Sequence, residues 1–170
     1  MQSHDTHKSP AADANKPGRT HASRQGPYAR LMVELAIDFV IMYLVMYTMI
    51  RTLDHFYLNI NNVWMTLMMV TPMALVMLFA MRSMFPSRNR NVLLIVGALL
   101  VFGVSYYGMR AQVGVGDKQF LRSMIPHHSG AILMCQEAAI TDPELKALCR
   151  DIVDSQTREI AQMKAMLKER

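Results

Sequence analysis

Three long runs of apolar residues, at 31–50, 63–81 and 92–108, constrain the fold of this chain more than any other feature. The first run contains two charged residues, Glu34 and Asp38, and the other two contain none. At about 1.5 Å per residue, helices of this length match a hydrocarbon core roughly 30 Å thick. Only 18% of the chain is charged, which leaves too little polar surface to cover three such helices in a soluble protein. We therefore predict three membrane-spanning helices.

The rest of the chain divides around these runs. Residues 1–28 are polar, and we expect them to form a disordered tail, since they offer little apolar surface to bury. No cleaved signal peptide is expected, because the first apolar run lies too far from the N-terminus and is too long. Residues 29–108 form the membrane region, 109–116 a glycine-containing linker, and 117–170 a separate helical domain.

The distribution of Lys and Arg predicts the orientation. Five precede the first apolar run, one lies in the first loop and three lie in the second loop. Because basic residues resist translocation, we expect a multi-pass protein of a bacterial inner membrane. Its N-terminal tail and second loop would be cytoplasmic, and the domain at 117–170 periplasmic. The net charge of +5 is scattered along the chain, so it gives no support to nucleic-acid binding.

Residues 117–170 have the pattern of two amphipathic helices. In the first, which begins at Asp117, apolar residues recur at spacings of three and four. The second starts with Asp142 as a cap and Pro143 at the first helical position, and its apolar stripe runs from 145 to 167. A tight turn between two such helices makes them antiparallel neighbours. The overall fold class expected is all-α, with an antiparallel helical hairpin after the three spans.

Pro126 leaves the start of the first hairpin helix open. Inside a helix it would free the carbonyl of Arg122 and kink the helix beside His127. Alternatively, Pro126 marks the true start of that helix, and residues 117–125 form a separate turn.

Potential metal ligands converge in the register of this hairpin. Met124 and His128 share a helix face, His127 is adjacent, and Glu159 and Met163 face them from the second helix. Imidazole and thioether ligands suit a soft or borderline ion, so we expect Cu(I) or Cu(II), with zinc or another divalent metal as alternatives. The alternative to metal binding is packing, in which the methionines fill core gaps and the histidines form a satisfied polar layer.

These residues also resemble a known family. Its features are Met-Ile-Pro-His-His within the stretch 120–134, then Gln-Thr-Arg-Glu-Ile at 156–160 followed by a methionine. The pattern is similar to the bacterial domain of unknown function 305, in its membrane-anchored branch. The resemblance implies a ferritin-like four-helix bundle and a role in copper or related metal handling in the cell envelope. It assigns ligand roles to Met124, His127, His128, Met134, Gln156, Glu159 and Met163.

Cys135 and Cys149 stand where that family usually has small apolar residues. Both fall in one predicted layer of the hairpin, so they form either a disulfide or an added thiolate pair for Cu(I). In an oxidising periplasm a disulfide is the expected state, and it would stabilise the hairpin by roughly 3 kcal/mol. A thiol pair that cycles would instead make the protein a redox protein.

Four further polar residues are candidates for a structural or functional role. Glu34 and Asp38 lie on one face of the first span, where carboxylates are costly, and we expect hydrogen bonds to another span. A cation or proton path is the alternative. Asp54 and His55 lie in the first loop, on the same side of the membrane as the hairpin, and form either a solvated pair or an extension of the metal site.

Methionine recurs at every fourth residue of the second span, and this spacing makes a continuous ridge. The ridge comprises Met65, Met69, Met73, Met77 and Met81, and Met42, Met46 and Met49 accompany it in the first span. Flexible packing between helices is the expected role. A thioether path for Cu(I) would require the ridge to line a cavity.

We therefore expect a membrane-anchored periplasmic metal-binding protein for copper sequestration, delivery or resistance. Two helices bury little by themselves, so a homodimer is expected, with docking onto the membrane helices or a partner as the alternative. The competing functions are a thiol–disulfide redox protein and a structural module that assembles with a metal transporter. The sequence contains no nucleophile constellation or phosphate-binding loop, so we do not expect an enzyme.

Overall fold

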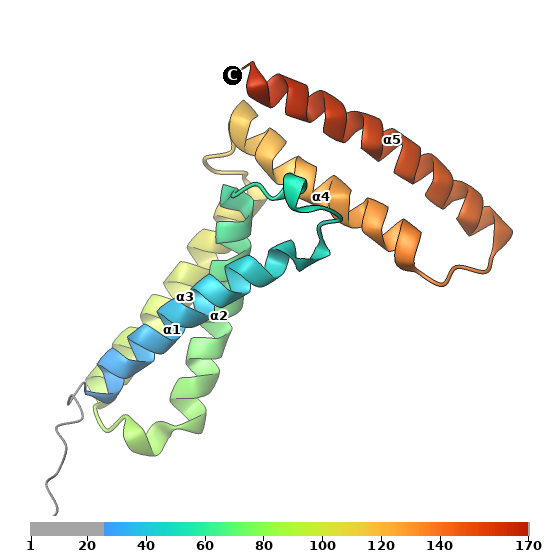
Figure 1. The fold of residues 1–170 in the computed structure, drawn as a ribbon. Helices are drawn as coiled ribbons and strands as arrows, with labels where there is room; N and C mark the ends of the chain where they lie inside the picture. Colours follow the sequence, from blue (N-terminus) through green and yellow to red (C-terminus); the bar gives the residue numbers. More distant parts are fainter. Residues whose placement is uncertain (1–25, 170) are drawn as a thin grey trace, which may run out of the picture.

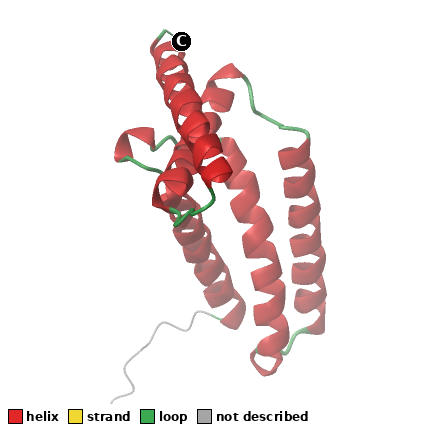
Figure 2. Ribbon diagram, turned by 90° about the vertical axis from the view of Figure 1, so that its right-hand side faces the viewer, coloured by secondary structure: helices red, strands yellow, loops and turns green. Residues whose placement is uncertain are grey.

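The computed structural model describes residues 26–169, and every regular element in that range is a helix (Figure 2). The five α-helices are α1 Pro27–Val45, α2 Ile60–Ala80, α3 Arg88–Arg110, α4 Asp117–Glu137 and α5 Pro143–Lys168. Short 3₁₀ helices lie in the connections: η1 Met46–Met49, η2 Leu53–His55 and η3 Arg82–Met84. Most of the tail expected at 1–28 lies outside the described residues.

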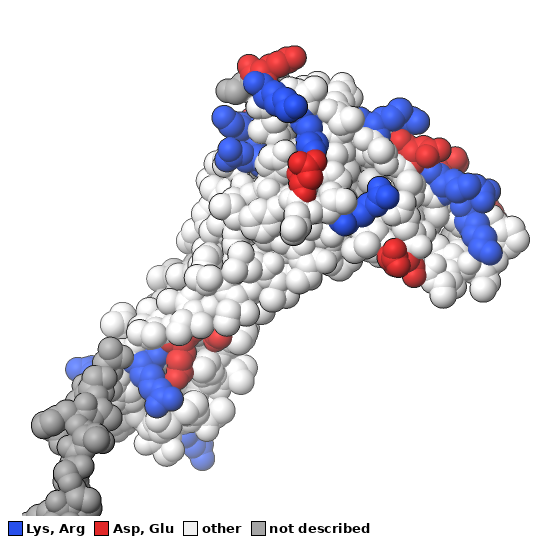
Figure 3. Space-filling view, in the orientation of Figure 1, with Lys and Arg blue, Asp and Glu red and all other residues white. Residues whose placement is uncertain are grey.

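Three of these helices are long and apolar enough to cross a membrane, as the apolar runs predicted. The candidate spans are Pro27–Met49, Ile60–Ala80 and Arg88–Arg110. Each starts before its apolar run, at Pro27, Ile60 and Arg88. The Asn59 side chain accepts a hydrogen bond from the Asn62 N–H at 2.9 Å. In Figure 3 a broad band without charged side chains covers these helices, between charged groups at both ends.

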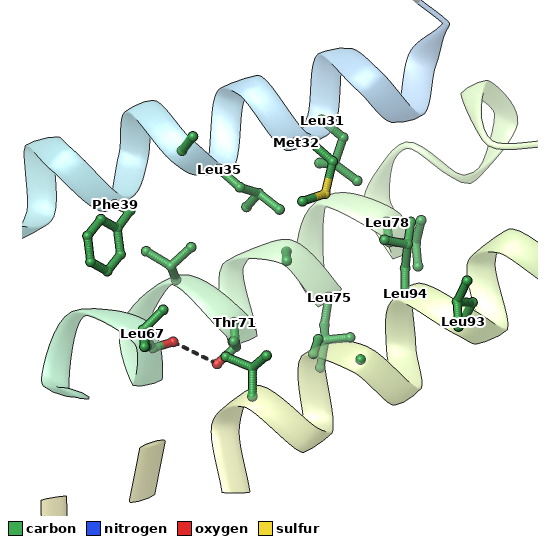
Figure 4. A pocket seen from close by; sticks show the side chains of 16 residues that line it. Leu31, Met32, Leu35, Phe39, Leu67, Thr71, Leu75, Leu78, Leu93 and Leu94 are labelled. Carbon is green, nitrogen blue, oxygen red and sulfur yellow. Dashed lines mark hydrogen bonds between the residues drawn. The ribbon is translucent and has the colours of Figure 1, made fainter. Parts of the chain in front are cut away.

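Helix α2 contacts both α1 and α3, and leucines from all three helices line an apolar cavity of about 410 Å³ between them (Figure 4). Two threonine hydroxyls of α2, those of Thr66 and Thr71, are satisfied within the helix. The Thr71 hydroxyl donates to the Leu67 carbonyl at 3.0 Å. At one end, the Tyr28 hydroxyl of α1 donates to Asn91 Oδ1 of α3 at 2.9 Å. The spans therefore pack through apolar side chains, and a hydrogen bond joins α1 to α3 at one end of the bundle.

The two carboxylates of the first span do not make the interhelical hydrogen bonds expected for them. Glu34 accepts a hydrogen bond from Arg30 Nε, one turn earlier on α1, at 2.9 Å. Asp38 has no hydrogen-bond or ion-pair partner within residues 26–169. Arg30 lies four residues before Glu34, so it can bind the Glu34 carboxylate within α1 without a partner from another span.

Helices α4 and α5 lie side by side and run in opposite directions (Figure 1). Their shared core consists of Leu121, Ile125, Ile132, Ile160 and Met163. Asp142 caps α5 as predicted, because its Oδ1 accepts from the backbone N–H groups of Glu144 and Leu145 at 2.8 and 3.0 Å. Helix α4 continues through Pro126, so the alternative of a separate turn at 117–125 is wrong.

A disulfide joins Cys135 near the end of α4 to Cys149 in α5, with their Cα atoms 5.2 Å apart. Of the two states considered for this pair, the structure therefore contains the bridge and not two free thiols. It ties the helices together next to the turn, where the apolar core is thinnest, since the buried residues of α4 end at Ile132.

The α4–α5 pair rests on the loop that joins α1 to α2 (Figure 1). The Arg51 N–H donates to the fully buried Ser129 hydroxyl of α4 at 2.7 Å. Beside it, a Cβ added to Gly130 would lie 3.4 Å from the Met49 carbonyl oxygen, so a small residue lets the backbones approach. The chain therefore covers one face of α4 with its own loop.

Among the glycines within the spans, Gly108 lies closest to a neighbouring helix. A Cβ there would lie 2.9 Å from the indole ring of Trp64, whose Nε1 donates to the Val113 carbonyl at 3.1 Å. We expect Gly108→Ala to lower the free energy of unfolding by about 1–3 kcal/mol, because the indole cannot move without losing its hydrogen bond. Gly103→Ala in the same helix is the matched control, since nothing lies within 4 Å of its Cβ position. Equal melting temperatures of the two variants in detergent would contradict the contact.

Candidate metal-binding site

The two adjacent histidines of α4 face different surroundings. Their ring centroids are 6.2 Å apart and their planes are inclined by 63°. His128 is turned toward α5, whereas His127 is exposed and lines a cavity that α4 forms with the ends of the spans. Consecutive residues of an α-helix project about 100° apart, so one pair can serve two sites.

Both ring nitrogens of His128 are engaged. Nδ1 lies 2.9 Å from the Met124 carbonyl oxygen, which can only accept, so Nδ1 carries a proton and donates it. Nε2 lies 2.7 Å from Glu159 Oε2. This backbone contact fixes the ring so that Nε2 is the nitrogen presented to α5, which is the arrangement found at metal-ligating histidines. A cation bound between Nε2 and the carboxylate would take the place of this direct contact.

The side chains of His128 and Glu159 differ in how freely they can move. The His128 side chain is 12% exposed and Glu159 is 52% exposed, so the carboxylate can swing to admit an ion while the imidazole stays fixed. Gln156 lies one turn before Glu159, on the same face of α5. Its Oε1 is buried and has no hydrogen-bond partner within residues 26–169, so this oxygen is free to coordinate a metal ion.

The predicted thioether ligands are divided between the core and the cavity. Met163 is buried with Ile125 and Ile160 in the core between α4 and α5. Met124 packs against that core and also lines the cavity beside His127, and Met134, which is 60% exposed, lines the same cavity. The ligands predicted as one cluster therefore fall into a His128–Glu159 pair and a separate His127–methionine group.

Within residues 26–169, no group of three or more His, Cys, Asp or Glu side chains is arranged to hold a metal ion. His128 and Glu159 provide two such donors, and the cysteines are bridged. A third ligand at this pair must therefore be an amide oxygen, a thioether or water. The oxygen of Gln156 is the candidate that the structure leaves without a partner.

Asp54 and His55 in η2 each contact the α4–α5 pair, and the Asp54 side chain remains 72% exposed to solvent. Asp54 forms an ion pair with Lys164 of α5, whose hydrogen bond and charge hold the pKa of Asp54 below 3.8. His55 Nδ1 lies 2.8 Å from the Ser129 hydroxyl of α4. Burial lowers the pKa of His55 below 6.5, and the Lys164 charge lowers it further. These residues hold the loop against α4 and α5, and neither contacts His128.

Protonation of His55 should weaken this docking. Neutral His55 can accept the Ser129 proton, whereas the protonated ring would leave that buried hydroxyl with two donors and no acceptor for its own proton. Because the folded-state pKa lies below 6.5, the unfolded state binds more protons at lower pH. We expect stability to fall as the pH drops from about 6.5 through the folded-state pKa.

His55→Asn offers an acceptor near the Nδ1 position but cannot titrate in this range, so its stability should depend less on pH. Thermal unfolding of both proteins between about pH 7.5 and about pH 5 measures the difference. Asp54 does not interfere, because Lys164 lowers the pKa of Asp54 and the contribution of this ion pair is lost at lower pH than this window. Equal pH slopes for the two proteins would contradict the proposed role of His55.

Ser129 and Met109 are functional candidates that sequence reasoning missed. Ser129 follows the histidine pair and receives the loop, and a small polar residue on the buried face of α4 was the available signal. Met109 follows the third apolar run and lines the cavity beside His127. It lay in the segment expected to be a linker, but α3 continues to Arg110 and carries it to the cavity.

Comparisons with known proteins place the α4–α5 pair in a recognised domain. The family model described as "Domain of unknown function (DUF305)" matches residues 108–167. The chain is 34% identical over 115 residues to "Uncharacterized protein L153" of Acanthamoeba polyphaga mimivirus, covering 66% of this chain and 74% of the relative. A stretch of that length must include residues before 108, so the likeness extends into the membrane region. No solved structure matches the chain.

Proposed function

The chain belongs to the family defined by domain of unknown function 305, and from this premise we propose that it is a membrane-anchored metal-binding protein that handles copper. The residues that resemble the family pattern are those that form the site between α4 and α5. In this proposal the protein sequesters or delivers copper, or confers resistance to it, and zinc or another divalent ion is the alternative cargo.

The single observation that carries the proposal is the geometry of His128. Its Nδ1 is committed to the Met124 carbonyl, and its Nε2 is aimed at the Glu159 carboxylate at 2.7 Å. The unpartnered Oε1 of Gln156 adds a neutral oxygen donor on the same face as Glu159. One imidazole nitrogen with carboxylate and amide oxygens fits a borderline ion such as Cu(II) or Zn(II). The nearby backbone carbonyl fixes the tautomer that such an ion requires.

The compartment and the assembly are part of the proposal. The alternating loop charges favour a cytoplasmic N-terminus and an α4–α5 pair on the periplasmic side of a bacterial inner membrane. There the pair would form half of a ferritin-like four-helix bundle in a homodimer. The loop at 51–58 already covers one face of α4, so a second copy would meet the face left open by that loop and by α5.

The bridged cysteines bear on the competing redox function. Both are half-buried, and their bridge crosslinks two helices of a hairpin. Neither has the Cys-x-x-Cys context that lowers a thiol pKa. A structural role in stabilising the hairpin therefore fits them better than a catalytic cycle.

Copper titration of the full-length protein in detergent, with X-ray absorption at the copper edge, tests the proposal. We expect saturable Cu(II) binding with imidazole nitrogen and oxygen in the first coordination shell. Binding without any imidazole signal, or no saturable binding, would refute the proposed function.

A further inference from the structure

A second cavity of about 500 Å³ lies where α4 meets the ends of the spans. Its wall is built from η1, the start of α2, the end of α3, the turn that follows α3, and α4. Six methionines line it: Met46, Met49, Met65, Met109, Met124 and Met134. No element supplies more than two of these, so thioethers converge on the cavity from segments far apart in the sequence.

The chemistry of the lining selects one kind of ligand. Besides the methionines, His127 supplies an imidazole, and the other polar residues carry neutral amide or hydroxyl groups. No Asp, Glu, Lys or Arg is among the lining residues. The wall offers a hard divalent ion only neutral oxygens and no carboxylate, whereas six thioethers and an imidazole favour a soft monovalent ion. Because no cationic side chain lines the wall, such an ion meets no direct charge repulsion there.

The methionines of the cavity differ from those that fill a core. Met163, in the core between α4 and α5, is 9% exposed. In contrast, Met134, Met49 and Met65 are 60%, 48% and 40% exposed. A methionine that serves only to fill gaps is enclosed by its neighbours, but these side chains surround an open volume and remain reachable by a ligand.

We propose that this cavity binds a soft monovalent cation, Cu(I) or Ag(I), through thioethers from the membrane helices and α4 together with the His127 imidazole. It is separate from the His128–Glu159 pair and does not depend on metal binding there. Three of its methionines, Met46, Met49 and Met65, precede residue 108, so the family domain supplies only part of the site. The site therefore requires membrane-region residues as well as α4.

Silver titration of the full-length protein in detergent, followed by calorimetry, tests this site, since Ag(I) is a redox-inert probe for Cu(I). In the variant Met46→Leu/Met65→Leu/Met109→Leu, leucine keeps the apolar volume and removes the sulfur. We expect its Ag(I) dissociation constant to rise at least about tenfold. The matched control is Met69→Leu/Met73→Leu/Met81→Leu, three exposed methionines outside the cavity, which should bind Ag(I) like the wild type.

Measuring both Ag(I) and Cu(II) binding in each variant distinguishes the two sites. We expect His127→Ala to weaken Ag(I) binding and leave Cu(II) binding unchanged, and the cavity triple variant to retain Cu(II) binding. Unchanged Ag(I) affinity in the cavity variant, or an equal loss in the control triple, overturns the cavity proposal even if Cu(II) binding at His128 stands. If the cavity variant fails to fold, absorption at the silver edge of the wild type decides: sulfur neighbours support the site, and a shell of nitrogen and oxygen alone overturns it.

Discussion

Replacing His128 by alanine is expected to weaken Cu(II) binding to the full-length protein by more than about 100-fold, since it removes a first-shell nitrogen, and outer-shell losses alone cost 10–100-fold. Alanine keeps the helix intact and leaves Glu159 able to reach water, because that side chain is 52% exposed. The loss should therefore appear in metal affinity and not in the folding of α4 and α5.

His127→Ala is the matched control for this change, because it removes an imidazole from the same helix without touching Glu159. Glu159→Gln should give an intermediate loss of about 10–100-fold, since the amide keeps an oxygen but loses the charge. Equilibrium dialysis against a copper chelator of known affinity measures all three variants. Equal losses for His127→Ala and His128→Ala would mean that the two rings share one site after all.

Removing the disulfide by the double change Cys135→Ser/Cys149→Ser is expected to lower the stability of the α4–α5 pair by about 3 kcal/mol, because the bridge closes a short loop in the unfolded chain. The effect should be local, since the membrane spans carry no cysteine. Amide hydrogen exchange within 117–168 should accelerate, while protection within α1, α2 and α3 stays unchanged.

Reductant provides the control for the disulfide prediction. It should reproduce the accelerated exchange in the wild type and have no effect on the double serine variant. Wild-type exchange that does not respond when the thiols are demonstrably reduced would contradict a stabilising role for the bridge.

Much of the helical architecture follows from local patterns in the sequence. Charge-free runs of membrane length predicted α2 and α3, and the Asp142–Pro143 cap predicted the start of α5. Helix periodicity and a tight turn predicted that Glu159 faces the surface of α4 that carries Met124 and His128, and its carboxylate lies against His128. Each of these depends on residues close in sequence, or on two helices joined by a short turn, where geometry leaves few alternatives.

The packing of segments that lie far apart in the sequence could not be predicted in the same way. The loop that carries Asp54 and His55 reaches Lys164 and Ser129 across more than seventy residues, and no local pattern specifies which loop covers α4. Which of the two adjacent rings faces α5 also depends on what surrounds α4, because the sequence alone allowed either His127 or His128 to do so. The methionine ridge of α2 contributes to the cavity only through Met65, and that depends on where α4 docks.

The most direct test of the metal-binding account is the copper retained per chain after equilibrium dialysis of the full-length protein, compared with its His127→Ala/His128→Ala variant. We expect the wild type to retain Cu(II) and the variant, although folded, to retain little or none. Unchanged Cu(II) stoichiometry in the variant would contradict the assignment of His128 to a metal site.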